Sequence, residues 1–291
     1  MNTSDNQPFP VADDRRHPPY RSARTLILTL CFMWSVFQLY VASVVPFVLT
    51  EWTGLSLVFN NQEVRQIHLA FAFALAMLAY PLNKQSPGAQ TPWYDYAAAM
   101  IAATSCLYLL VFKDQISDRA GLPTDSDLWI SAIGMLSLAL ALYRCLGLPL
   151  LIVCSCFLFY VFFGDQSFMP DTMQWKGASL NKALWHFWMQ TEGVFGVALG
   201  VASSMIFLFV LFGALLEKAG AGIYFIRLAY ALLGHLRGGP AKAAVVASGL
   251  SGIYSGSSIA NVVSTGTFTI PLMKKTGLTA EKAGAIEVAA S

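Results

Sequence analysis

The chain has 291 residues, of which 56% are hydrophobic and only 12% are charged. A soluble domain carries about 25% charged residues, so this composition and a mean hydropathy of +0.57 indicate an all-α integral membrane protein. The formal net charge of +2 gives no sign of nucleic-acid binding, and no such partner is expected.

The first 24 residues are polar and contain four arginines, and the apolar run after them is too long for the core of a cleaved secretory signal. We therefore predict a tail followed by a span that stays in the membrane. Six apolar runs could cross a bilayer, which takes about 20 residues of helix, and three of them lie near the lower limit of about 17. These runs are residues 25–49, 66–82, 94–112, 128–143, 146–163 and 193–216.

The distribution of basic residues predicts the orientation of these spans. Lys and Arg accumulate in short cytoplasmic loops, and a cytoplasmic N-terminus leaves few of the 18 basic residues outside. Those left outside are Arg65, Lys113, Arg119, Lys176 and Lys182. This topology makes residues 164–190 periplasmic, and residues 180–189 within them could form an interfacial amphipathic helix.

The cysteines and histidines show no metal-site spacing. The five cysteines lie in or beside apolar runs and are interpreted as small buried hydrophobes, so no cofactor is expected from them. They are Cys31, Cys106, Cys145, Cys154 and Cys156.

The region after the sixth run has basic residues at informative places. The segment between Lys218 and Arg237 is short and contains Arg227, which favours a helix along the cytoplasmic interface. Residues 243–273 follow Lys242 and precede Lys274, so both of their ends belong on the cytoplasmic side. About 31 residues suffice for two half-crossings but not for two full ones. We therefore predict a re-entrant helical hairpin that turns near residues 255–258.

The predicted turn is rich in glycine and side-chain oxygens. Non-helical backbone at membrane depth is tolerated only where it is buried in protein or lines a watery cavity. Such a turn could bind a sodium ion or a substrate carboxylate. The candidate binding residues are Ser255, Gly256, Ser257, Ser258, Asn261, Thr265 and Thr267. The alternative is that these small residues only pack helices together.

Two other classes of function are weighed against transport. A membrane-embedded enzyme would show ionisable residues within its spans, and the only suggestive ones, His68 and Glu192, have interfacial explanations. Ser203 and Ser204 in the sixth run favour helix packing. A non-transporting scaffold or assembly subunit is the second alternative.

Residues 237–277 resemble the first hairpin region of the large membrane subunit of tripartite ATP-independent periplasmic (TRAP) transporters. They read RGGPAKAAVVASGLSGIYSGSSIANVVSTGTFTIPLMKKTG. Supporting stretches are TEGVFGVALGVASSMIFLFVLFGALLEKAGAG at residues 191–222 and EKAGAIEVAAS at residues 281–291. The resemblance is closest to the branch in which the small and large membrane subunits are fused and the partner is a TAXI-type binding protein.

The resemblance implies a sodium-coupled elevator-type permease, not an enzyme, in the bacterial inner membrane among its lipids. It implies that a periplasmic TAXI-type protein delivers an organic acid anion. The implied organisation is a cytoplasmic tail (1–24), a four-helix scaffold similar to the small subunit (25–145), a connecting helix with a periplasmic linker (146–190) and the N-terminal part of the transport domain (191–291).

The resemblance also assigns roles within the hairpin. Sodium is expected at Ser255, Gly256 and Ser257, and the substrate carboxylate at nearby hydroxyls. The family continues past the position of Ser291 with further spans and a second hairpin that closes the site. A C-terminally truncated chain, and a site that is half built, are therefore expected.

Overall fold

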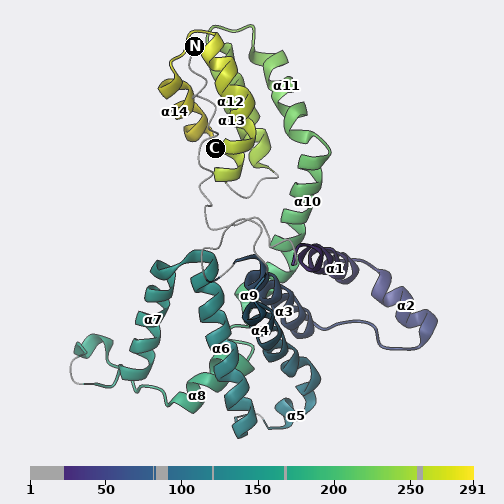
Figure 1. Cartoon of the computed structure of the whole chain (residues 1–291), viewed down its shortest axis with the longest axis vertical. Coiled ribbons are helices and arrows are strands. Elements are labelled where there is room, and N and C mark those ends of the chain that lie inside the picture. The colour runs from purple at the N-terminus through teal and green to yellow at the C-terminus, as the bar shows by residue number, and fades with distance from the viewer. Residues whose placement is uncertain (1–22, 81, 83–90, 120, 167–168, 254–257) are drawn as a thin grey trace. The chain divides into compact units, whose positions relative to one another are not determined.

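The computed structural model describes residues 23–80, 82, 91–119, 121–166, 169–253 and 258–291. Within these ranges every regular element is a helix, which confirms the prediction of an all-α fold for this part of the chain (Figure 1). The chain divides into two compact units, Met1–Ser203 and Ser204–Ser291, and each is described by itself.

Among the described residues, four helices are long and apolar enough to cross a membrane. They are α1 (Arg24–Ala42), α4 (Trp93–Val111), α6 (Asp125–Leu146) and a helix over Val197–Lys218. The last of these consists of α9 (Val197–Val201), a π-helical turn, η3 (Ala202–Ile206), and α10 (Phe207–Lys218). The other predicted runs are occupied by α3 (Asn61–Ala79) and by α7 (Leu148–Phe163), an apolar helix of only 16 residues.

The first predicted run, residues 25–49, is not one continuous helix. α1 ends at Ala42, and α2 (Val45–Thr53) begins after a short break. Pro46 lies in the first turn of α2, where its missing N–H costs little, whereas within one long helix it would remove a backbone hydrogen bond. The hydroxyl of Ser43 donates to the carbonyl of Tyr40 (2.8 Å) and accepts from the backbone N–H of Val45 (3.2 Å), so it stabilises the break.

In the first unit, α3, α4 and α6 pack together, and α1 lies beside α3 (Figure 1). A capping box starts α3, since the side chain of Asn60 accepts from the backbone N–H of Glu63 while the Glu63 carboxylate accepts from that of Asn60. The short α5 (Lys113–Asp118) follows α4. After η1 (Asp171–Met173), the predicted interfacial segment forms α8 (Leu180–Leu184) and a π-helical turn, η2 (Trp185–Met189), which packs on α6.

Trp188 organises the core of the first unit. Its ring is fully buried, stacks on Phe73 with centroids 6.4 Å apart, and meets Phe195 edge to face at 5.2 Å. A side-chain carbon at Gly134 of α6 would clash with the Trp188 ring, so glycine allows η2 to approach α6 closely. Trp185, Trp188 and Phe195 are therefore core residues that attach η2 and the chain after it to the bundle.

A buried ion pair joins α4 to α6. Nη1 of Arg144 lies 2.8 Å from Oδ1 of Asp95, and the two side chains are only 2% and 1% exposed. The same nitrogen donates to the carbonyls of Met77 (2.9 Å) and Tyr80 (3.3 Å) at the end of α3. One arginine thus connects three helices.

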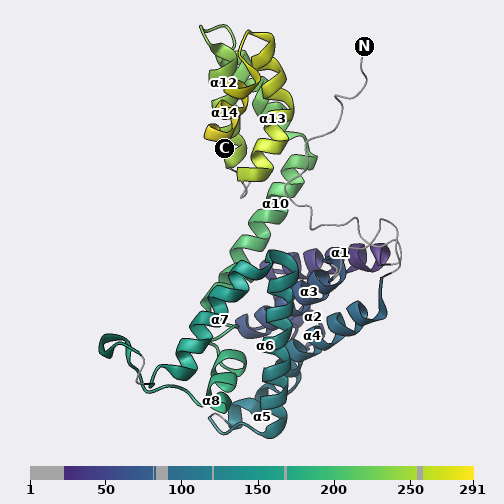
Figure 2. The same cartoon turned by 60° about the vertical axis from the view of Figure 1, so that its left-hand side comes forward.

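In the second unit, four helices follow α10. These are α11 (Ala221–Leu233), which occupies the predicted cytoplasmic interface segment, α12 (Gly239–Gly252), α13 (Ser258–Lys275) and α14 (Ala280–Ala290). Figures 1 and 2 both show α12, α13 and α14 side by side, and each pair of them is in contact. The buried face of α12 is built of small side chains, including Ala243, Ala244 and Ala247, which let its neighbours approach closely.

Candidate functional site

The predicted hairpin residues fall into three groups in the structure. Ser255, Gly256 and Ser257 lie outside the described residues. Ser258 begins α13 and is exposed. Asn261 and Thr265 are buried, at 2% and 1% exposure, and lie one helical turn apart on the same face of α13. Thr267 is exposed, because two residues of α-helix turn the chain by about 200°. The structure therefore brings Asn261 and Thr265 together and leaves Thr267 on the opposite face.

Asn261 connects three parts of the second unit. Its Nδ2 donates to the carbonyl (3.1 Å) and the hydroxyl (2.9 Å) of Ser248 on α12 and lies 3.5 Å from the hydroxyl of Ser291, which follows α14. The hydroxyls of Ser248 and Ser291 are 2.8 Å apart. The carboxamide of Asn261 thus lies at the centre of a buried polar junction.

A buried carboxylate from α14 lies against the next turn of α13. Glu287 of α14 is fully buried, and it accepts hydrogen bonds from the hydroxyls of Thr265, at Oε1, and Thr269, at Oε2 (2.5 Å). Each threonine hydroxyl is also within hydrogen-bonding distance of the carbonyl four residues before it, at 2.7 and 3.0 Å. Since each hydroxyl has one hydrogen, it can release the carboxylate and donate to its own helix instead.

In the part of the chain that the structure describes, Glu287 forms no ion pair with a lysine, arginine or histidine. An ionised carboxylate in such a place is costly unless a cation or several hydrogen bonds compensate it. No group of three or more His, Cys, Asp or Glu side chains that could hold a metal gathers among the described residues. The cluster offers one carboxylate with hydroxyl, amide and carbonyl oxygens, a set better suited to a monovalent cation than to a divalent one.

The sequence-based prediction missed Glu287, Thr269 and Ser248. The signal for Glu287 was its position in the apolar stretch AGAIEVAAS, since an acidic residue among Ala, Ile and Val is expensive unless it has a partner. Thr269 extends the spacing of four residues that runs from Asn261 through Thr265. Ser248 could not be separated from the other serines of α12 without knowing which face of that helix is buried.

The helix ends beside residues 254–257 have opposite polarity. α12 ends at Gly252, and α13 begins at Ser258. Carbonyls at a helix C-terminus attract cations, while N–H groups at an N-terminus attract anions. Near this end of α12, Ser251 is buried, and its hydroxyl has no hydrogen-bond partner among the described residues. Polar groups are therefore present on the helix ends that flank the predicted turn.

Residues 133–291 match the family model described as "Tripartite ATP-independent periplasmic transporter, DctM component". This segment is more than half of the 291 residues, and it contains the whole cluster around Asn261 and Glu287. Searches of the curated proteins and of the solved structures found no match.

Proposed function

Because the chain belongs to the family of DctM components of tripartite ATP-independent periplasmic transporters, we propose that it is a sodium-coupled permease for an organic acid anion. The family is a transporter permease and not an enzyme, so the membrane-enzyme hypothesis is set aside. A DctM component works with a periplasmic binding protein and a small membrane subunit. The chain is accordingly a multi-pass membrane component of a transporter.

The observation that carries the proposal of sodium coupling is the buried oxygen cluster on α12, α13 and α14. The carboxylate of Glu287 supplies one negative charge in a place where no basic side chain of the described chain pairs with it. Thr265 and Thr269 place hydroxyl oxygens against that carboxylate, and each can turn its hydrogen to a helix carbonyl and present a lone pair instead. A sodium ion held nearby would balance the buried charge.

The turn residues have a complementary role in the proposal. Ser255, Gly256 and Ser257 would supply sodium ligands at the end of α12, where helix carbonyls favour a cation. The substrate carboxylate would lie at the start of α13, near Ser258, where N–H groups favour an anion. Thr267, on the exposed face of α13, could contribute only where a further segment covers that face.

The wider organisation is also proposed from the sequence. Residues 25–145 would form a scaffold like the small subunit, residues 146–190 the connection, and residues 191–291 part of the transport domain. The family match begins at residue 133, so the first three predicted spans precede it, while most of the fourth span and the proposed connection lie within it. The bias of basic residues favours a cytoplasmic N-terminus in the bacterial inner membrane. A TAXI-type binding protein would be the periplasmic partner.

The test is uptake of a labelled organic acid into proteoliposomes. The transporter, completed past Ser291 by the further spans and second hairpin that the resemblance implies, is reconstituted with a TAXI-type binding protein outside and with an inward sodium gradient. We expect accumulation with sodium and none when potassium replaces it. Asn261→Ala should lower uptake roughly 5- to 150-fold, because a lost buried polar contact is worth about 1–3 kcal/mol.

The matched control is Thr276→Ala, since this hydroxyl donates locally to the carbonyl of Met273 and takes no part in the Glu287 cluster. Uptake that is equal in potassium and sodium would contradict sodium coupling. Full uptake by Asn261→Ala would assign the cluster to helix packing alone.

A further inference from the structure

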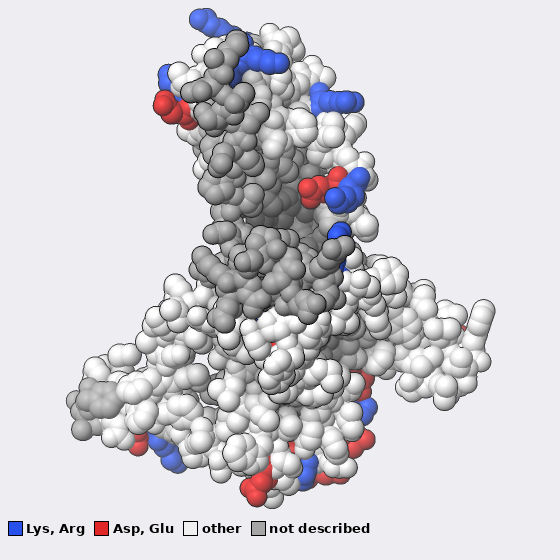
Figure 3. Space-filling view, viewed as in Figure 1, with Lys and Arg blue, Asp and Glu red and all other residues white. Residues whose placement is uncertain are grey.

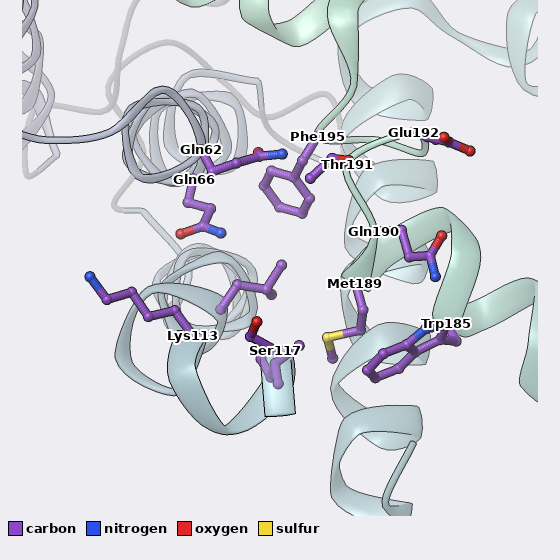
Figure 4. A pocket seen from close by; sticks show the side chains of 12 residues that line it. Gln62, Gln66, Lys113, Ser117, Trp185, Met189, Gln190, Thr191, Glu192 and Phe195 are labelled. Atoms are coloured by element: carbon purple, nitrogen blue, oxygen red, sulfur yellow. The ribbon is translucent and has the colours of Figure 1, made fainter. Parts of the chain in front are cut away.

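The first unit contains a pocket of about 400 Å³ (Figure 4). It is lined by Gln62 and Gln66 of α3, by Lys113 at the start of α5, and by Trp185 and Met189 of η2. Figure 4 shows the carboxamide of Gln62 pointing toward the ring of Phe195, and that of Gln66 pointing down into the open space of the pocket. The pocket belongs to the first unit, whereas the Asn261 and Glu287 cluster belongs to the second.

Three polar atoms in the wall of this pocket lack a partner. Among the described residues, Oε1 of Gln62, Oε1 of Gln66 and Nε1 of Trp185 are buried and make no hydrogen bond. The side chains of Gln66 and Trp185 are only 8% and 6% exposed. Buried polar atoms are nearly always hydrogen-bonded, so three of them around one pocket indicate a ligand with donors for the two glutamines and an acceptor for the indole.

The charges at the pocket favour a cationic donor. The ammonium of Lys113 points away from the pocket in Figure 4 and bonds to Glu63 at 2.7 Å, so it is already neutralised. Glu192 lies at the exposed rim and forms no ion pair with any described residue; in Figure 4 its side chain points away from Gln62 and Gln66, so its negative charge acts on the pocket only from the rim. The unsatisfied acceptors and this negative charge suit a primary ammonium, which has three N–H donors.

The position of the pocket indicates an amphiphilic ligand. Apolar side chains, Leu109, Ile116, Met189 and Phe195, line the rest of its wall. Leu109 is near the end of α4, a helix apolar enough to span a membrane, and the charged α5 follows directly. In Figure 3 charged side chains of the first unit gather at the end where α5 lies, while the visible flanks are largely uncharged. The pocket therefore opens where the apolar surface meets the polar end.

We propose that this pocket binds the headgroup of a membrane phospholipid that carries a primary ammonium. The ammonium donates to the carbonyls of Gln62 and Gln66 and is attracted by Glu192. A phosphate or ester oxygen of the lipid accepts from Nε1 of Trp185, and the start of the acyl chains lies against the apolar wall. Gln62 and Gln66 precede the family match and Trp185 lies within it, so the lipid would join these two parts of the chain.

The test measures binding of defined lipids to the purified, delipidated full-length chain in detergent. Native mass spectrometry and the shift of the unfolding temperature report binding of phosphatidylethanolamine, phosphatidylcholine and phosphatidylglycerol, and free phosphoethanolamine is the soluble source of the same headgroup. We expect phosphatidylethanolamine to bind at least about 10-fold more tightly than the other lipids, because only it offers ammonium N–H donors. We expect free phosphoethanolamine to bind weakly, because it lacks acyl chains.

Gln66→Leu nearly preserves volume, and Trp185→Phe removes the indole N–H together with one ring; each should weaken phosphatidylethanolamine binding about 10-fold. Without lipid, Gln66→Leu should be as stable as the parent chain or more so, because it removes an unsatisfied buried carbonyl. The control is Gln115→Leu, an exposed position on α5 outside the pocket, which should bind lipid like the parent. Equal binding of phosphatidylcholine, full binding by Gln66→Leu, or equal stabilisation by free phosphoethanolamine would each overturn the proposal.

Discussion

The buried ion pair between Asp95 and Arg144 gives the sharpest prediction for stability. The two atoms are 2.8 Å apart and both side chains are almost completely buried. At an effective dielectric constant of about 20 their attraction is about 6 kcal/mol, but removing both charges from water costs several kcal/mol for each ion. We therefore expect the pair to contribute little net stability, while the loss of one partner is severe.

Arg144→Met leaves the Asp95 carboxylate buried without its partner and should lower the free energy of unfolding by about 3–5 kcal/mol. Asp95→Asn should lower the free energy of unfolding by an amount at the lower end of that range, because Arg144 keeps its hydrogen bonds to the carbonyls of Met77 and Tyr80. The double variant should cost at least about 2 kcal/mol less than the sum of the two single variants.

The assay is equilibrium unfolding in mild detergent, followed by tryptophan fluorescence for the parent, both single variants and the double variant. The control is Asp114→Asn, an exposed change on α5, and its free energy of unfolding should stay within about 0.5 kcal/mol of that of the parent. A coupling energy below about 0.5 kcal/mol between Asp95 and Arg144 would refute the argument, because the two residues would then act independently.

Three further predictions concern packing, pH and topology. Gly134→Ala should destabilise the first unit by about 1–3 kcal/mol, because the new methyl group clashes with the Trp188 ring, and the same unfolding assay measures this. Burial raises the pKa of Glu63. The hydrogen bonds from Lys113 and from the backbone N–H of Asn60, together with the charge of Lys113, lower it by more, so the pKa of Glu63 lies below its ordinary value of 4.5. The stabilisation from Glu63 should therefore be present above pH 4.5 and be lost as the pH falls through the lowered pKa; Glu63→Gln should flatten this acid limb of the stability profile, and an unchanged limb would refute it. A cysteine at position 181, in a cysteine-free background, should react with an impermeant reagent from the periplasmic side, whereas labelling only from the cytoplasm would reverse the proposed topology.

Hydropathy predicted where the helices lie much better than where they break. The runs at residues 66–82, 94–112 and 128–143 correspond to α3, α4 and α6, because a long apolar segment has few ways to satisfy its backbone except as a helix. The prediction of a single helix for the first run was wrong, because the apolar sequence continues through Pro46 while the helical backbone hydrogen bonds do not. An average over a window of residues does not detect one missing donor.

The candidate site shows a different limit of sequence interpretation. Asn261 and Thr265 were found because polar residues are conspicuous in an apolar segment, and their shared face follows from helical spacing. Glu287 was missed because its partners lie 18 and 22 residues earlier, on another helix, and only the packing of α14 on α13 brings them together. Thr267 was included because composition alone does not distinguish the two faces of α13.

Arg144 has a consequence for the segment between α3 and α4. The last carbonyls of a helix usually need capping groups from the residues that follow it. Here the carbonyls of Met77 and Tyr80 are capped by a guanidinium from another helix, and its positive charge also suits the negative end of the α3 dipole. The end of α3 therefore places few demands on the connecting sequence, whose length and composition can change without unwinding the helix.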